Sequence, residues 1–227
     1  MKTIFELKQV TLPVQGEDAQ FPVNRVYCVG RNYAEHAKEM GADPSREAPF
    51  FFGKPADAVF MPAGKVPYPT RTKDLHHEVE LVVALKAGGS SLTLEQARDA
   101  VYAYAVGIDF TRRDLQADAK KQGRPWDTAK GFDCSGPVTA LVPVSKTGWL
   151  DKGAITLSLN GQPKQRGDLS DLIWKVDEII AELSTYYTLK AGDVIFTGTP
   201  AGVGAANQGD EVDAAIEGVG RLVFKMA

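Results

Sequence analysis

The sequence predicts a β-rich α+β fold, a mixed β-sandwich or roll with few helices. Short apolar or alternating segments bounded by turn residues outnumber helical patterns, and no internal repeat of about 20 to 50 residues is visible. Apolar residues recur at helical spacing over one long segment, 170–187. The strand-like segments lie at 78–85, 102–110, 138–142, 155–159, 193–197, 211–216 and 220–225.

Length and charge fit one globular domain. The 227 residues predict a single domain, 1–227, with a strand or hairpin extension at 1–20. The net charge of −3 without a basic stripe argues against nucleic acid, and no apolar run is long enough to span a membrane. The N-terminus lacks the apolar region of a signal peptide, and two cysteines make no disulfide framework. We expect a cytoplasmic enzyme or binding protein.

The first half of the chain predicts a hairpin, a short helix and an irregular segment around the central strands. Apolar runs at 4–15 and 23–29 flank a polar turn. Good helix formers at 33–40 are followed by Gly41 and Pro44. Residues 47–72 are rich in proline and phenylalanine, which favours an ordered segment without a regular ladder. Thr93 is placed to cap a helix at 93–101.

In the second half, residues 111–130 mix charged and small residues and predict a loop or short helix that lines a site. Asn160 and Gly161 indicate a hairpin turn, and Ser170 is placed to cap the helix at 170–187. The glycine-rich turn at 198–204 exposes backbone N–H groups and the Thr199 hydroxyl. It lacks the lysine of a phosphate-binding loop, so nucleotide binding is not expected.

Two acids interrupt the most strand-like segment of the chain. In a strand, Glu78 and Glu80 point to one face while Val79 and Leu81 point to the other. Two like charges held side by side favour a cation between them, and paired carboxylates are suited to a hard divalent ion. A solvated strand face explains the same pattern, and the residues alone leave both readings open. Asp109 is a further acid, placed after a separate apolar run.

His36 and Glu39 share one face of the short helix predicted at 33–40. At this spacing a carboxylate can hydrogen-bond the imidazole and raise its basicity. An exposed histidine beside a helical glutamate is the simpler interpretation of the pair taken alone.

Several separate motifs together resemble the fumarylacetoacetate hydrolase family. They are GRNYAEH at 30–36, KP at 54–55, HHEVE at 76–80, DFTRRDLQ at 109–116, Lys130 and GTPAGVG at 198–204. The resemblance covers nearly the whole chain from about residue 26 and implies the fold of the family's C-terminal domain. Within the family, the short form and the segments around 29–41 and 49–52 are most similar to the acylpyruvate hydrolases, and above all to fumarylpyruvate hydrolases.

The resemblance also implies roles for individual residues. Glu78, Glu80 and Asp109 match the family's metal ligands, and three carboxylates suit one Mg²⁺ or Mn²⁺ per subunit. His36 and Glu39 match its activating pair. Four further positions match residues that act on the ligand: Lys130, Arg113, Gln116 and Thr199. A second carboxylate on the substrate would need another cation, for which Arg31, Lys54 and Arg124 are candidates.

The implied activity is the metal-dependent hydrolysis of a C–C bond in a 2,4-dioxo acid. For fumarylpyruvate, an intermediate of gentisate breakdown, the products are fumarate and pyruvate. Related members instead decarboxylate oxaloacetate, or isomerise and decarboxylate hydroxy-diene-dioates. The resemblance further implies a homodimer. A non-catalytic β-rich binding module, with Glu78 and Glu80 on a solvated face, is the more distant alternative.

Overall fold

The computed structural model describes residues 3–35 and 47–227. Its largest sheet has six strands in the order β12-β9-β8-β15-β3-β4. β8 pairs antiparallel with both β9 and β15, and β15 runs parallel to β3. The strands of this sheet are β3 (Val26–Gly30), β4 (Phe50–Lys54), β8 (Val79–Leu85), β9 (Val101–Ile108), β12 (Val142–Pro143) and β15 (Val194–Phe196).

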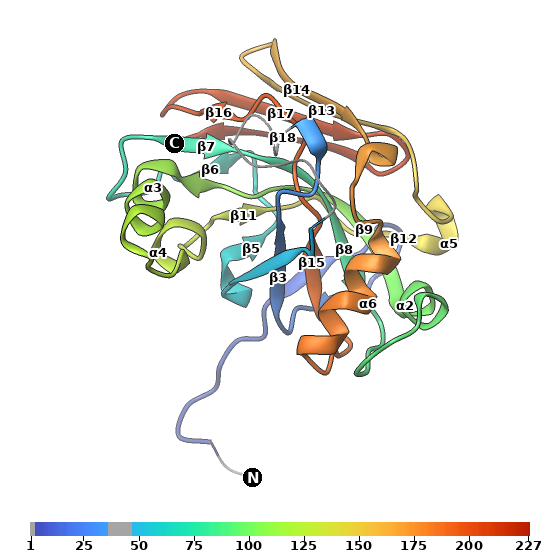
Figure 1. Cartoon of the computed structure of the whole chain (residues 1–227). Helices are drawn as coiled ribbons and strands as arrows, with labels where there is room; N and C mark the ends of the chain where they lie inside the picture. Colours follow the sequence, from blue (N-terminus) through green and yellow to red (C-terminus); the bar gives the residue numbers. More distant parts are fainter. Residues whose placement is uncertain (1–2, 36–46) are drawn as a thin grey trace.

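A second sheet of five strands lies across one face of the first, along the top of the molecule in Figure 1. Its order is β14-β13-β17-β18-β6, and the tight turn at Asn160 and Gly161 joins β13 to β14. Both turn residues have positive φ, as a two-residue hairpin turn of type I′ requires. The strands are β6 (Lys65–Val66), β13 (Ala154–Leu159), β14 (Gln162–Asp168), β17 (Glu211–Ile216) and β18 (Gly220–Met226).

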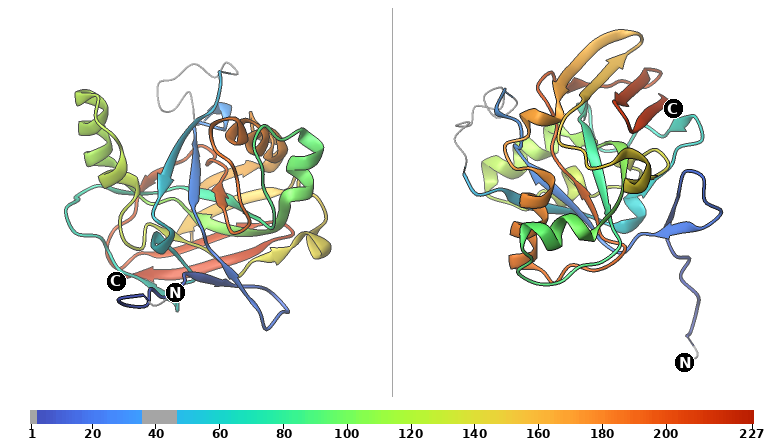
Figure 2. Two further views of the ribbon diagram at one scale, coloured as in Figure 1. Left: turned by 90° about the horizontal axis from the view of Figure 1, so that it is seen from below. Right: turned by 90° about the vertical axis from the view of Figure 1, so that its right-hand side faces the viewer.

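Three smaller ladders complete the β structure. β7 (Leu75–His77) pairs with both β10 and β16, directly before the central strand β8. The N-terminal hairpin joins β1 to β2, and the chain before it projects away from the body (Figure 2). The remaining strands are β1 (Thr11–Pro13), β2 (Gln20–Pro22), β5 (Val59–Phe60), β10 (Thr111–Arg112), β11 (Gly136–Pro137) and β16 (Gly204–Ala205).

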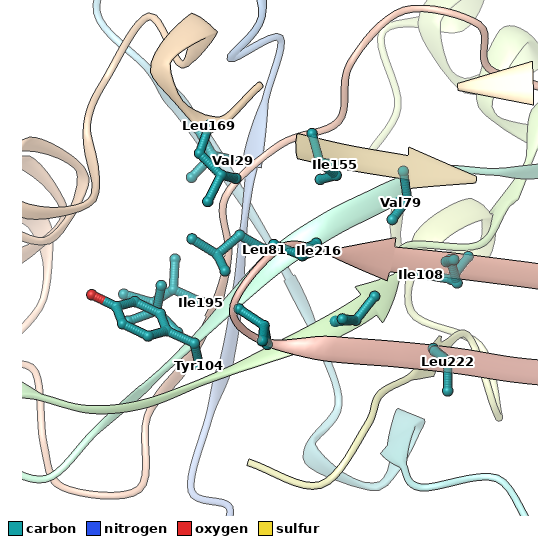
Figure 3. Close-up of a cluster of buried hydrophobic side chains, with 14 of the residues drawn as sticks. Val29, Val79, Leu81, Tyr104, Ile108, Ile155, Leu169, Ile195, Ile216 and Leu222 are labelled. Atoms are coloured by element: carbon teal, nitrogen blue, oxygen red, sulfur yellow. The ribbon is translucent and has the colours of Figure 1, made fainter. Parts of the chain in front are cut away.

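The core lies between the two large sheets, and β8 is its centre. Alternate side chains of β8, such as Leu81 and Val83, join the cluster that also contains Ile155 and Ile216 from the second sheet (Figure 3). The opposite face of β8 packs Val82 into a second cluster. All seven residues of β8 are therefore buried, and a polar side chain here must find its partners inside the protein.

Four of the described helices form two pairs. α2 packs against α6, at the right of Figure 1, and α3 packs against α4, at the left, where α4 contacts β4. α5 contacts β9 and β12. Within the described residues, no helix is long and apolar enough to cross a membrane. The helices are α2 (Leu94–Ala100), α3 (Arg113–Gln122), α4 (Asp127–Lys130), α5 (Val144–Thr147) and α6 (Val176–Tyr186), with 3₁₀ turns η1 (Ala56–Ala58) and η2 (Leu169–Asp171).

The predicted β-rich α+β class is confirmed, and three local predictions are wrong. The segment 47–72 does contain a regular ladder, because β4 pairs antiparallel with β3 along its whole length. Ser170 does not cap a helix, because Asp168 caps the separate turn η2 and α6 begins only at Val176. The strand predicted at 138–142 is reduced to the short pairings of β11 and β12, each of which contains a proline. Proline has no N–H to donate to a ladder, so a longer strand is interrupted here.

Candidate active site

Three buried carboxylates meet where β7, β8 and β9 come together. Glu78 lies between β7 and β8, Glu80 is on β8, and Asp109 follows β9. The β8–β9 register places Asp109 beside Glu78, and the Asp109 N–H donates to the Glu78 carbonyl at 2.8 Å. One oxygen from each side chain lies within 4.8 Å of the others. The sheet thus joins the adjacent acids to a third that is distant in sequence.

Three cations pair with Glu78 and Asp109. The Lys130 ammonium lies 2.7 Å from Glu78 Oε2 and 2.7 Å from Asp109 Oδ2. Lys54 lies 2.8 Å from Asp109 Oδ1, and Arg113 pairs with Glu78 Oε1. Burial favours loss of the Lys130 proton, but Asp109 and Glu78 outweigh burial and raise its pKa above the usual value. Lys130 is therefore a fixed positive charge and not a general base.

Glu80 retains the least compensated charge of the three acids. Burial, together with the like charges of Asp109 and Glu78, raises the pKa of its carboxyl well above the usual value, although Lys130 and the Gly198 N–H oppose this. A divalent ion among the carboxylates would relieve this repulsion. Three oxygen donors with no histidine or cysteine among them suit Mg²⁺ or Mn²⁺. The residues present therefore fit such an ion.

The carboxylates of Glu78 and Glu80 open into a cleft that lies between α3, β4 and the glycine-rich turn. One end is buried and holds Glu78, Glu80 and Lys130. The other end is formed by more exposed residues. The remaining lining residues are Val29, Gly30, Arg31, Phe50, Phe52, Arg113, Gln116, Lys120, Trp126 and Thr199.

α3 forms one wall of this cleft. Arg113 donates from Nη1 to Gln116 Oε1 at 2.7 Å and from Nη2 to Glu78. Gln116 therefore accepts through its oxygen and keeps its amide NH₂ for a ligand. Lys120 lies two helical turns beyond Arg113 and lines the same cleft. Sequence reasoning missed Lys120, and the helical spacing of these three residues is the signal that could have found it.

The glycine-rich turn contributes Thr199 to the cleft and forms a hydrogen bond with the candidate metal ligand Glu80. The Gly198 N–H donates to Glu80 Oε2 at 2.7 Å. The Thr199 hydroxyl donates to the Val79 carbonyl at 2.8 Å and accepts from Gln165 at 2.8 Å. Its proton is thus used within the protein, so a hydrogen bond donated by Thr199 to a ligand would come from its backbone N–H.

The structure separates the candidate cations for a second substrate carboxylate. Arg31 lines the cleft, whereas Lys54 is buried and bonded to Asp109 and Ser135. Arg124 is exposed and is not among the cleft residues. His36 and Glu39 lie outside the described residues, so their predicted roles stay predictions. Phe50, Phe52 and Trp126 are cleft residues that sequence reasoning did not assign.

Comparisons with known proteins agree with this architecture. The chain is 44% identical over 180 residues to a fumarylpyruvate hydrolase of Ralstonia sp, a match that covers 79% of the chain and 93% of the relative. It is 42% identical over 205 residues to oxaloacetate tautomerase YcgM of Escherichia coli (strain K12), covering 90% of the chain and 93% of the relative.

A crystal structure of fumarylpyruvate hydrolase from Pseudomonas aeruginosa, in complex with Mn²⁺ and pyruvate, superposes with a TM-score of 0.97 at 48% identity. The match covers 100% of this chain and 99% of that one. The sequence model for the C-terminal domain of fumarylacetoacetate (FAA) hydrolase matches residues 25–227. The buried acids, the sheet arrangement and these matches identify the chain as an enzyme of the fumarylacetoacetate hydrolase family.

Proposed function

We propose that the protein hydrolyses the C3–C4 bond of an acylpyruvate, and that fumarylpyruvate is its substrate. The observation that carries this proposal is the cluster of Glu78, Glu80 and Asp109 at the buried end of a cleft whose walls supply fixed donors. The related enzyme from Pseudomonas aeruginosa, with Mn²⁺ and pyruvate bound, supports it. Pyruvate is the product that this reaction would release from every acylpyruvate.

Glu78, Glu80 and Asp109 would hold one Mg²⁺ or Mn²⁺ per subunit, and this ion would supply Lewis-acid stabilisation of negative charge on the oxo-acid end of the substrate. The protein's own contribution is to hold these carboxylates in place. Gly198 and Thr111 donate hydrogen bonds to Glu80 and Glu78, at 2.7 and 3.1 Å, and so fix their orientation.

Hydrolysis requires donors for the oxyanion that forms when water adds to C4. Lys130 uses two of its three N–H groups on Glu78 and Asp109, which leaves the third for a ligand oxygen. Gln116 presents its NH₂ group because Arg113 occupies its oxygen. Both donors are held by other residues before substrate arrives, and such preorganised groups stabilise developing negative charge effectively.

The attacking water requires a base, and we assign this role to His36 with Glu39 as its partner. The assignment comes from their spacing in the sequence and from the family resemblance. An imidazole titrates near neutral pH and can take a proton from water. Addition of water to C4 and cleavage of the C3–C4 bond would then give fumarate and the enol form of pyruvate. Arg31, shortly before His36 in the chain, lines the cleft.

A second candidate function is the tautomerisation of oxaloacetate, which the 42% identity to the Escherichia coli enzyme favours. That reaction moves a proton between carbon and oxygen and breaks no C–C bond. It needs the same binding of an oxo-acid end but no attacking water. Decarboxylation of oxaloacetate likewise needs no activated water.

The deciding experiment measures steady-state rates on fumarylpyruvate, maleylpyruvate, acetylpyruvate and oxaloacetate with one preparation of the protein. Release of pyruvate from fumarylpyruvate at the highest kcat/KM is expected. Treatment with EDTA should abolish the activity, and Mn²⁺ or Mg²⁺ should restore it. Rapid oxaloacetate tautomerisation without cleavage of any acylpyruvate would favour the second candidate, and full activity in metal-stripped protein would refute the ligand assignment.

A further inference from the structure

We propose that Lys120 and Arg31, at the exposed end of the cleft, bind a second carboxylate of the substrate. The protein would then select 2-oxo acids that carry a carboxylate at the far end of an extended acyl chain. This inference rests on the proposed function for the orientation of the ligand, with its oxo-acid end at the buried carboxylates.

The cleft has two charged ends joined by an aromatic wall. At the buried end, the Lys130 ammonium lies 5.0 Å from the centre of the Phe52 ring. The ring centres of Phe52 and Trp126 lie 5.8 Å apart. The Lys120 ammonium lies 5.2 Å from the centre of the Trp126 ring. The wall therefore runs from the candidate metal site to Lys120. An extended, conjugated chain could lie along it.

Arg31 is held at the same end of the cleft by Phe50. Its guanidinium carbon lies 5.7 Å from the centre of the Phe50 ring, and that ring meets Trp126 edge-on at 5.3 Å. The two cations thus rest on neighbouring aromatic rings. Aromatic faces can hold such cations in position through cation–π attraction.

The chain conformation at Arg31 is an unusual one. Its φ is +58°, a left-handed value that is uncommon for residues with a side chain. The preceding Gly30 lies against Phe50, and a Cβ atom there would come within 2.0 Å of the ring. Both features bring Arg31 and Phe50 to the cleft, and such conformations tend to occur at functional sites.

Neither cation has an anionic partner among the residues that the structure describes. Lys54, Lys130 and Arg113 are all bonded to the buried acids, whereas no hydrogen bond or ion pair joins the side chain of Lys120 or of Arg31 to a described residue. Burial and the positive charges of Arg113 and Arg31 lower the pKa of Lys120. An anion bound between Lys120 and Arg31 would relieve this repulsion.

The ligand class follows from this arrangement. A lysine and an arginine suit a carboxylate, and the arginine fork can bind it through two hydrogen bonds. Fumarylpyruvate carries its second carboxylate at the end of a planar chain, whereas acetylpyruvate ends in a methyl group. Oxaloacetate has its second carboxylate only two bonds from the oxo carbon, so that group would remain near the buried end.

Binding of two matched ligands tests the subsite without relying on turnover. 2-Oxoheptanedioate has the carbon chain length of fumarylpyruvate but no 4-oxo group to be attacked, and 2-oxoheptanoate lacks its distal carboxylate. Titration calorimetry on the Mn²⁺-loaded protein gives the ratio of their dissociation constants. We expect the wild type to prefer the diacid, and Lys120→Met and Arg31→Met each to reduce this preference about 10- to 100-fold. Lys120→Arg, which keeps the charge, should retain most of it.

Lys121→Met is the matched control, because Lys121 is exposed on the same helix and is not among the cleft residues. An unchanged preference in both Lys120→Met and Arg31→Met, or an equal loss in Lys121→Met, would overturn the subsite. The kcat/KM ratio of fumarylpyruvate to acetylpyruvate should fall in parallel. Absence of any acylpyruvate cleavage would refute the proposed function instead, while the two dissociation constants would still decide the subsite.

Discussion

The ammonium nitrogen of Lys130 lies 2.7 Å from Oε2 of Glu78, and both side chains are almost completely buried. The same nitrogen lies 2.7 Å from Asp109. Lys130 therefore links two candidate metal ligands and compensates part of their charge when no ion is bound. Removing one partner of a buried ion pair is costly because the other charge is left uncompensated. The stability of the protein and the affinity of its metal site should consequently be coupled through this residue.

Lys130→Met should lower the free energy of unfolding by about 3 kcal/mol in EDTA, because it leaves buried carboxylates with less positive charge. Mn²⁺ should recover part of this loss, since the ion takes over the compensation and binds only the folded state. Urea unfolding with and without Mn²⁺ measures both effects. Lys121→Met, which changes the same charge on the surface, should alter neither. An equal loss of stability in EDTA and in Mn²⁺ would contradict the coupling.

Glu80→Gln should separate stability from metal binding. The raised pKa of Glu80 means that ionisation of its carboxyl is unfavourable in the metal-free folded protein. The glutamine removes that charge, and its oxygen can still accept from the Gly198 N–H. We expect the free energy of unfolding in EDTA to stay equal or rise, while the Mn²⁺ dissociation constant increases roughly 100-fold or more. Glu95→Gln on the exposed face of α2 is the control. Unchanged Mn²⁺ affinity would remove Glu80 from the ligand set.

The local part of this site could be predicted from the sequence, and the long-range part could not. Alternation along a strand is enough to place Glu78 and Glu80 on one face. The position of Asp109 depends on the β8–β9 register, which no local pattern specifies. Family resemblance supplied that third acid. Lys54 shows the same limit. It was a candidate for binding a second substrate carboxylate, but it is buried against Asp109 and Ser135, and this burial depends on contacts with distant segments.

Helix boundaries show the same limit. Ser170 has the chemistry of a helix cap, but Asp168 and Asp171 form a capping box at the start of η2, and that turn ends at Asp171. α6 then begins after Lys175, where Glu178 accepts from the Lys175 N–H. Lys120 was missed for a related reason. Because residues 111–130 mix charged and small side chains, the sequence did not predict the length of α3. It therefore did not show that Arg113, Gln116 and Lys120 share the face of α3 that lines the cleft.

Gln165 should be important for stability although it is not among the cleft residues. Its buried side chain accepts from the Val79 N–H at 3.1 Å and donates to Thr199 and Pro200, so it joins β14 to β8 and the glycine-rich turn. Gln165→Met keeps the size but leaves these polar groups unsatisfied, and we expect a loss of about 3 kcal/mol or more in urea unfolding. Gln162→Met, exposed on the same strand, should cost little. Equal effects of the two changes would show that these hydrogen bonds contribute nothing specific.

His36→Ala should separate catalysis from ligand binding. If His36 activates the attacking water, its loss should reduce fumarylpyruvate hydrolysis by about 10² to 10⁴-fold. Binding of Mn²⁺ and of oxalate, a planar mimic of the pyruvate enolate, should persist because the carboxylates and Lys130 are intact. Calorimetry with oxalate and a pyruvate-release assay on one preparation measure both properties. Glu78→Ala is the contrasting variant and should lose both. Hydrolysis by His36→Ala at the wild-type rate would exclude the imidazole as the base, whereas loss of oxalate binding would show that His36 helps to hold the ligand.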